Sequence, residues 1–491
     1  MPPEDPAPLS GAAHPAATVL WSPPPGMRRA RPQRPGQILS ALSRARRTSL
    51  LFGPDHPVVL ETMSEAHTLI SHLLAQRASL RFFIDGDAFF VENTVLLEES
   101  LQLQPLLAEL RAREIGAIEL HAGLVPAELR SLVELLGLPP AEIHRRGGPT
   151  TTLQQLGVRH IVVGPSGPPR QDLDLRVDPR EAYRAGLQVV DELTFQASRD
   201  VPLDLRKARL ILTSLMDIIA RNREALLGVS AIKDYDEDTA HHSVNVSVLS
   251  LLVGSQLELD RVGLTTLGLA ALLHDIGKVR VPWEILTKAS KLTQEELQVV
   301  RRHTLYGAQI LRELPGLARL AMVVAFEHHA NYDLSGYPAI TAKPAPHLLT
   351  RIVQVADFYD AATSARRVYQ RAMLPHEAIT FILARAGKVF DPVVARIFVQ
   401  QEGLYPVGSV VELDSGEVGV VIAPAEREVA RPVVSLVRGR GGKPLPAVVV
   451  NLLEERKRRI ARALDPLDAG VDCVAALQER AVSCEVSPTY L

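Results

Sequence analysis

Helical periodicity runs almost unbroken from Pro179 to about Gln400, and this long stretch constrains the fold more than any other feature of the chain. Apolar residues recur at three- and four-residue spacing, which is typical of helices that bury one face in a shared core. The stretch is also rich in histidine, since seven of the 15 histidines fall between positions 241 and 347. The sequence therefore predicts an all-helical domain with imidazole side chains on or at the ends of its helices.

Several of these histidines stand close to acidic residues. The groups are His242-Ser243, His274-Asp275-Ile276-Gly277-Lys278, His303, Glu327-His328-His329 and Val355-Ala356-Asp357. Imidazole and carboxylate together suit divalent first-row metals. Six or seven such groups exceed the ligand set of one tetrahedral site, and they suffice for two metals that share a carboxylate and hydrolyse phosphoesters. A single histidine on a helix is usually an ordinary core or surface residue, so the prediction depends on the ordered set.

The order and spacing of these groups resemble the HD-GYP domain, a branch of the HD phosphohydrolase superfamily. The resemblance covers about 40% of the chain, from about residue 205 to 400, and extends to Gly336-Tyr337-Pro338 and Phe390-Asp391-Pro392. It implies a helical bundle, a centre of two divalent metal ions with a third in some relatives, and hydrolysis of cyclic di-GMP to pGpG or GMP in bacterial second-messenger signalling. Iron and manganese are the favoured metals, although the same ligands accept several.

The resemblance also assigns roles to individual residues. The metal ligands that it implies are His242, His274, Asp275, His303, His328, His329 and Asp357. Asp275 would bridge the metals, Lys278 would reach the scissile phosphate, and a metal-bridging hydroxide would be the nucleophile. Asp238 lies one helical turn before His242 and would support a third metal, but an N-terminal helix cap explains it equally well.

Substrate contacts are expected from two segments. Gly336, Tyr337 and Pro338 would form a loop near the substrate. One of Arg366 and Arg367 could bind a phosphate through two hydrogen bonds, and ordinary surface charge is the alternative.

The chain departs from the family pattern in the loop after the paired histidines. Ala330, Asn331 and Leu334 occupy positions where the family usually has Glu, Arg and Gly. Loss of a carboxylate behind the ligands weakens metal binding or activity by about 10–100-fold, and Leu334 would resist a positive φ angle. Two alternatives therefore stay open: hydrolysis of another cyclic dinucleotide, and a weak or inactive sensor that binds metal or nucleotide and signals through protein partners.

The flanking regions indicate a multidomain protein. We expect a disordered Pro-rich tail at 1–35, which holds 10 of the 36 prolines, an α/β input or interaction module at 36–165, and a linker at 166–180. The helical domain would span 181–403, with lead helices at 181–199 and 205–227. A small β-barrel or meander is expected at 404–455 and a tail at 456–491 that begins as a basic helix. In the input module we expect helices at 58–76, 103–111 and 126–136, and strands at 80–84, 88–96, 115–121 and 159–163.

The composition limits the classes of binding partner and the cellular location that we expect. The formal net charge is −2 and aromatic residues make up 4%, so neither a basic surface nor a stacking platform for DNA or RNA is expected. The two cysteines, Cys473 and Cys484, form no disulfide framework and favour a reducing, cytoplasmic location. Apolar runs fall short of the ~18 residues of a membrane span. A signalling protein could bind residues 36–165, and residues 205–227 could form a homodimer, although a buried intramolecular face explains their apolar stripe as well.

Overall fold

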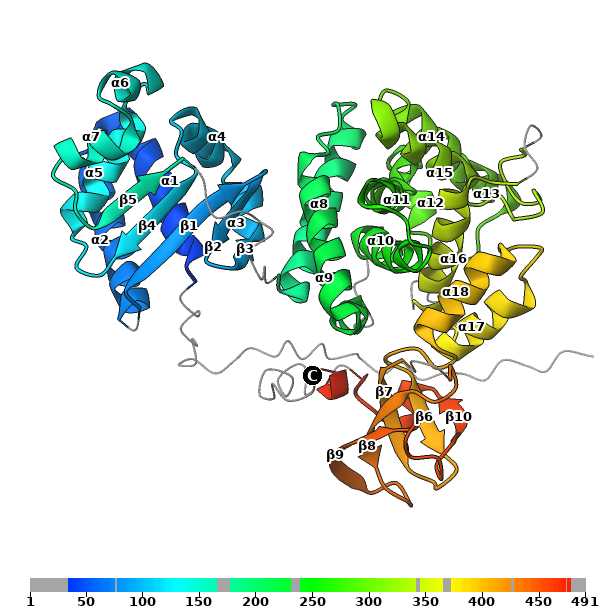
Figure 1. The fold of residues 1–491 in the computed structure, drawn as a ribbon. Coiled ribbons are helices and arrows are strands. Elements are labelled where there is room, and N and C mark those ends of the chain that lie inside the picture. Colours follow the sequence, from blue (N-terminus) through cyan, green and yellow to red (C-terminus); the bar gives the residue numbers. More distant parts are fainter. Residues whose placement is uncertain are drawn as a thin grey trace, which may run out of the picture.

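The computed structural model of the chain describes residues 34–75, 77–165, 177–230, 239–340, 345–364, 372–424, 428–473 and 475–477. Figure 1 shows an N-terminal α/β module, a central helical bundle and a small C-terminal β-sheet unit. The predicted tail at 1–35 lies almost wholly outside the described residues, as do positions 166–176 of the linker. Asp238, Arg366 and Arg367 also lie outside them.

The N-terminal module is an antiparallel sheet covered by helices. Its elements are α1 (Gly36–Phe52), α2 (Pro57–Leu74), β1 (Ser79–Asp85), β2 (Ala88–Val91), β3 (Thr94–Leu96), α3 (Leu97–Gln102), α4 (Gln104–Ala112), β4 (Ala117–His121), α5 (Pro126–Gly137), α6 (Pro140–Arg145), α7 (Pro149–Gln155) and β5 (Ile161–Gly164). The strand order is β3-β2-β1-β4-β5, and Asp85 pairs with Ala88 across the predicted hairpin turn. The predicted helices and strands of this module are confirmed to within a few residues, except that the run 88–96 divides into β2 and β3.

The two faces of this sheet pack against different partners. Phe82 and Phe89 belong to a buried cluster with α1, α2 and α5. Because side chains alternate along a strand, Phe83 and Phe90 point to the other face, where their rings stack at 4.8 Å. That second face joins α3 and the buried core of the helical bundle. The module is therefore packed directly onto the bundle.

The helical bundle confirms the predicted all-helical domain. Its elements are α8 (Pro179–Ser198), α9 (Arg206–Ser230), α10 (Thr239–Gln256), α11 (Arg261–Leu273), η2 (Ile276–Arg280), α12 (Trp283–Leu286), α13 (Gln294–Arg301), α14 (His303–Leu311), η3 (Gly316–Arg319), α15 (Leu320–Glu327), α16 (Leu348–Thr363), α17 (Pro375–Ala384) and α18 (Pro392–Glu402). Helix α10 is buried almost all round and packs against α8, α9, α11, α16 and α18. Helix α11 carries Gly268 at a close approach to two neighbours, because a Cβ atom there would lie 2.5 Å from the Leu212 side chain of α9 and 3.1 Å from that of Leu251 on α10.

The segment that runs from α11 through η2 has the length and composition of a membrane span. Among the described residues, Arg261–Arg280 is the one stretch with the length and hydropathy for such a span, and 67% of its most apolar window is buried inside the bundle. The apolarity of α11 is explained by packing, because this helix lies in the core of the bundle and carries the His274-Asp275 pair at its end.

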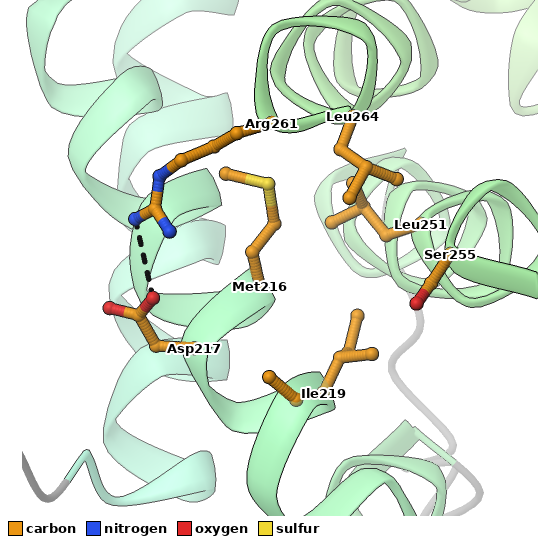
Figure 2. A pocket seen from close by; sticks show the side chains of 8 residues that line it. Met216, Asp217, Ile219, Leu251, Ser255, Arg261 and Leu264 are labelled. Atoms are coloured by element: carbon orange, nitrogen blue, oxygen red, sulfur yellow. Dashed lines mark hydrogen bonds and ion pairs between the residues drawn. The ribbon is translucent and has the colours of Figure 1, made fainter. Parts of the chain in front are cut away.

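A cavity of about 180 Å³ lies between α9, α10 and α11. Figure 2 shows its mainly apolar wall, which includes Met216, Leu251 and Leu264. At its edge the Arg261 guanidinium points toward the Asp217 carboxylate, with 3.2 Å between nitrogen and oxygen. None of the predicted site residues lines this cavity.

The C-terminal unit corrects two predictions. Its elements are β6 (Val410–Leu413), β7 (Val418–Ala423), β8 (Val433–Arg438), β9 (Pro444–Asn451), β10 (Ile460–Leu464) and α19 (Pro466–Ala469). The sheet order is β10-β6-β7-β8-β9, so β6 to β9 form the meander, but the outer strands do not pair and the predicted barrel is wrong. The predicted basic helix after 454 is also wrong, because residues 455–459 form turns and irregular backbone. Strand β10 then pairs with β6, where Arg462 binds Glu412 at 2.7 Å. The sheet thus extends beyond the predicted boundary at 455.

Candidate metal centre

Five helical elements bring the predicted ligands together. His242 lies on α10, His274 caps the end of α11, His303 begins α14, His328 caps α15 and Asp357 lies on α16. The turn η2, which follows Asp275, lies directly against α14. A Cβ atom at Gly277 would lie 2.0 Å from the backbone oxygen of His303, so only glycine permits this approach.

The potential ligand atoms form two groups, and a third set, His274, Asp275 and His328, connects them with its atoms likewise within 4.8 Å of one another. Nitrogen or oxygen atoms of His242, His274 and Asp357 all lie within 4.8 Å of one another, and we call these residues the His242 group. The same holds for His303, His328 and His329, which we call the His303 group. All seven residues implied by the resemblance are therefore adjacent in the structure.

Asp275 lies between the two groups. Its Oδ2 is 3.4 Å from Nε2 of His274 and 3.6 Å from Nε2 of His242. Its Oδ1 is 3.4 Å from Nε2 of His303 and 3.7 Å from Nε2 of His328. One carboxylate oxygen faces each group, which is the placement that a bridging ligand requires.

Backbone carbonyls orient three of the imidazoles. Nδ1 of His274 donates to the Ala271 oxygen at 2.7 Å, and Nδ1 of His303 donates to the Val300 oxygen at 2.7 Å. Nδ1 of His328 lies 3.0 Å from the Ala325 oxygen. A carbonyl can only accept, so the proton of each neutral ring is on Nδ1 and the lone pair of Nε2 is directed at the centre.

Buried polar atoms without partners indicate that the residues fit a cation. His274 Nε2 and Asp275 Oδ1 are buried and accept no hydrogen bond within the described chain. Nε2 of His303 and Nε2 of His328 lie only 3.1 Å apart although both are acceptors in the tautomers just described. Unpartnered acceptors that converge in the core are costly unless a positive ion lies among them.

The electrostatics of the His303 group suit metal ligation. Burial, with neighbouring imidazoles, holds the pKa of His328 well below its usual range and lowers the pKa of His329 to about 4. Burial also lowers the pKa of His303. The three imidazoles are therefore neutral near pH 7, which is the form that binds a metal.

The acidic residues have the complementary charge. Burial opposes the ionised form of Asp275, but Lys278 and His274 hold its pKa well below the usual range. Burial likewise opposes the ionised form of Asp357, whose pKa is held low by its hydrogen bond to His242 and by nearby histidines. The pKa of His274 is raised because Asp275 outweighs its burial. The charge that attracts a proton to His274 also attracts a cation.

The predicted substrate loop lies beside the His303 group. The Tyr337 ring is tilted over His329 with 4.6 Å between the ring centroids. Gly336 has a φ of +94°, and a Cβ atom there would lie 2.4 Å from the His329 backbone oxygen. Leu334 also has a positive φ, +67°, so the loop needs at this position the conformation that a leucine resists.

Some residues near the site were missed by sequence reasoning. The Arg301 guanidinium lies 5.0 Å from the centroid of the Tyr337 ring. The only feature of the sequence that could have indicated Arg301 was its position directly before Arg302 and His303. Tyr183 and Asn245, which connect to the predicted ligand His242 through Asp360, carry no recognisable motif.

Comparison with known proteins agrees with this geometry. The family model of the HD domain matches residues 213–394. The chain is 37% identical to a cyclic di-GMP phosphodiesterase of Pseudomonas aeruginosa over 296 residues, which are 59% of this chain and 71% of that protein. It is 33% identical over 218 residues to a cyclic di-GMP phosphodiesterase response regulator of Xanthomonas campestris, covering 44% of this chain and 57% of the relative.

A third relative has a different named substrate. The chain is 38% identical over 154 residues to a 3'3'-cGAMP-specific phosphodiesterase of Vibrio cholerae, covering 31% of this chain and 33% of that protein. The HD domain match, the relative covered over 71% of its length and the assembled ligand set lead to one conclusion. The chain belongs to the HD-GYP family of phosphodiesterases.

Proposed function

We propose that this protein hydrolyses cyclic di-GMP to pGpG or GMP at a centre of two divalent metal ions, iron or manganese by preference. The single observation that carries the proposal is Asp275, whose two oxygens face two separate ligand groups. Two ions held in this way supply a water-derived nucleophile at neutral pH and neutralise charge on the attacking and leaving oxygens.

The protein's own residues position these charges. The His242 group would hold one ion and the His303 group the other, with Asp275 between them. Burial of these ligands excludes bulk water and strengthens each electrostatic interaction. The lone pairs of the tethered imidazoles are already aimed, so little reorganisation is needed on binding.

Lys278 is the proposed contact to the scissile phosphate. Its Nζ forms an ion pair with Asp275 Oδ2, and its side chain is 29% exposed. It therefore lies at the border between the buried carboxylate and solvent, where a phosphate would enter. As a point charge it would stabilise negative charge that develops on the phosphate oxygens.

Features of the loop after His329 support a second candidate substrate. Tyr337 beside His329 offers an aromatic face, and Arg301 offers a cation next to it. Ala330, Asn331 and Leu334 differ from the usual family residues, and one relative is named for 3'3'-cGAMP. Another cyclic dinucleotide is therefore the second candidate substrate, and a sensor without turnover is the third possibility. A third metal at Asp238 and contacts from Arg366 or Arg367 stay predictions.

The cellular setting is also a proposal. The N-terminal module that packs on the bundle is suited to receive a signal from a protein partner, and the composition favours the cytoplasm. A homodimer through α9 stays a prediction, because most of the apolar stripe of α9 is buried within its own chain.

The test is a direct assay on the full chain purified without oxygen. Bound metal is quantified, and cyclic di-GMP and 3'3'-cGAMP are incubated separately while products are followed by chromatography. Turnover of cyclic di-GMP with two or more metals per chain is expected. Asp275→Asn should abolish it, whereas Asp468→Asn, a change in an exposed carboxylate of the C-terminal unit, is the matched control. Full metal occupancy without turnover of either nucleotide would overturn the proposed hydrolysis in favour of a sensor.

A further inference from the structure

His242 is oriented differently from the other ligand histidines. The rings of His274, His303 and His328 are each tethered to the backbone carbonyl three residues earlier in the chain. The Nδ1 atom of His242 instead lies 2.7 Å from Oδ2 of Asp360, a side chain on α16. The direction of this ring therefore depends on a carboxylate that can itself shift, whereas the other three depend on local backbone.

Two further buried side chains hold that carboxylate. Asn245 Nδ2 donates to Oδ1 of Asp360 at 2.9 Å, and the Tyr183 hydroxyl donates to Oδ1 of Asn245 at 2.7 Å. Asn245 and Asp360 are each 2% exposed and Tyr183 is 7% exposed. An ionised carboxylate only accepts, so the Asn245 nitrogen must face Asp360 and its oxygen must face Tyr183. The chain of hydrogen bonds thus has one direction, from the tyrosine to the ligand.

Tyr183 lies on α8, the helix on which the N-terminal module packs. The buried cluster that includes Tyr183 and Val189 of α8 also includes Phe90 of the sheet, and Leu97 and Leu101 of α3. The backbone N–H of Glu98 also lies 3.5 Å from Oε1 of Glu181, two residues before Tyr183. A change in how α3 packs on α8 would therefore act on the segment that carries the tyrosine.

We propose that Tyr183 and Asn245 are positioning residues for the His242 group, acting through Asp360, and that through them the packing of the N-terminal module on α8 sets the metal affinity of this group. The inference rests on the proposed metal centre and does not require turnover of any particular nucleotide. Residues behind a metal ligand commonly affect affinity even though they do not touch the ion.

The first experiment titrates Mn²⁺ into the metal-free full chain by calorimetry and resolves the two binding steps. Tyr183→Phe keeps the ring and removes one buried hydrogen bond, so about a fivefold weaker affinity is expected for one step only. Asp360→Asn removes the charge beside His242 and should weaken the same step by about 10–100-fold. The other step should stay unchanged, because the His303 group has no part in the chain of hydrogen bonds.

Tyr359→Phe is the matched control. Tyr359 is also buried in the bundle, beside Asp360, and its ring packs on Phe398 with 5.2 Å between centroids. It removes a hydroxyl that lies near the charge of Asp360 but takes no part in the hydrogen bonds that run from Tyr183 to His242. Equal weakening by Tyr359→Phe and Tyr183→Phe would overturn the inference, as would weakening of both steps equally.

The link to the module is tested by a double-mutant cycle. In the otherwise unaltered chain, Leu101→Ala in α3 should weaken the same metal-binding step that Tyr183→Phe weakens. It should have no further effect when Tyr183→Phe is already present. The absorption spectrum of bound Co²⁺ supplies a second readout, which should change for the His242 group alone. Additive effects of the two changes would overturn the link. Failure of the unaltered chain to bind metal would overturn the proposed function first, whereas two normal steps in Tyr183→Phe would overturn this inference alone.

Discussion

Replacing Glu402 by glutamine should stabilise the bundle in a way that depends on pH. Glu402 ends α18, is 5% exposed, and has one buried carboxyl oxygen without a hydrogen-bond partner. Burial raises the pKa of its carboxyl to about 8, and Arg223 opposes this only partly. In the unfolded chain the pKa is near 4.5. The folded protein therefore keeps a proton that the unfolded chain loses over the intervening range.

The sign and size of the effect follow from this difference. Below about pH 4.5 the folded and unfolded states both bind the proton, so ionisation of Glu402 does not lower the free energy of unfolding. Between about 4.5 and 8 the unfolded state binds fewer protons, and stability falls by about 1.4 kcal/mol per pH unit. At pH 7 the accumulated cost is on the order of 3 kcal/mol, and above about pH 8 it stays constant. Glu402→Gln removes this cost while it keeps the shape of the side chain.

The assay is denaturant unfolding of the metal-free protein from pH 4.5 to 8.5, followed by circular dichroism of the helices. The difference between Glu402→Gln and the unaltered chain should grow with pH and then level off, since other titrating groups cancel in the difference. Glu327→Gln is the matched control, because that buried carboxylate accepts hydrogen bonds from the His347 N–H and the Thr350 hydroxyl. Glu327→Gln should lower the free energy of unfolding by about 1–3 kcal/mol, and it should not stabilise the protein at neutral pH. A difference for Glu402→Gln that is independent of pH would refute the reasoning.

Three further predictions concern the site. Lys278→Ala should lower kcat by about 10²–10³-fold with metal content unchanged, measured by product chromatography and elemental analysis; a loss of metal would contradict a role on the phosphate. His274→Ala and His303→Ala should each reduce the metal content from two ions to one, and two retained ions in either variant would contradict the two-group arrangement. Leu334→Gly or Leu334→Asn should raise the stability of the chain, because both residues tolerate a positive φ. Leu334→Val should lower the free energy of unfolding by about 1 kcal/mol. The reverse order would show that the loop relaxes at this position.

Sequence reasoning predicted residues that the structure brings together, because their order along the chain matches a family pattern and several of them stand in pairs. His274-Asp275 and His328-His329 are adjacent in the chain and follow the ends of their helices, and together with the other groups of the ordered set they indicated a common site. The hydrogen bonds from Tyr183 to Asn245 and from Asn245 to Asp360 join residues 62 and 115 positions apart. Such contacts depend on how three helices cross, and the periodicity of apolar residues in the sequence does not indicate them.

The errors in the flanking regions have a similar cause. Strand β10 follows Arg456-Lys457-Arg458-Arg459, whose basic character resembles a solvated helix. Its residues become a strand because they complete a ladder with β6 from the other end of the unit. Closure into a barrel likewise depends on the pairing of β9 with β10, and the sheet twist that decides this is not visible in the order of apolar residues.

The altered loop after His329 is a well-connected structure, and this bears on how any loss of activity should be interpreted. The Ala330 oxygen accepts a hydrogen bond from Gln354 at 2.9 Å, and Asn331 Nδ2 donates to the Ser335 hydroxyl at 2.8 Å. The Tyr332 N–H also binds the Val389 oxygen at 2.8 Å. Leu334 is thus the one substituted position with an unfavourable backbone angle. If hydrolysis proves slow, reverting Leu334 alone should change stability more than rate. A recovered rate would instead have to come from restoring charge at positions 330 and 331, because those substitutions remove chemical groups while the loop that carries them stays in place.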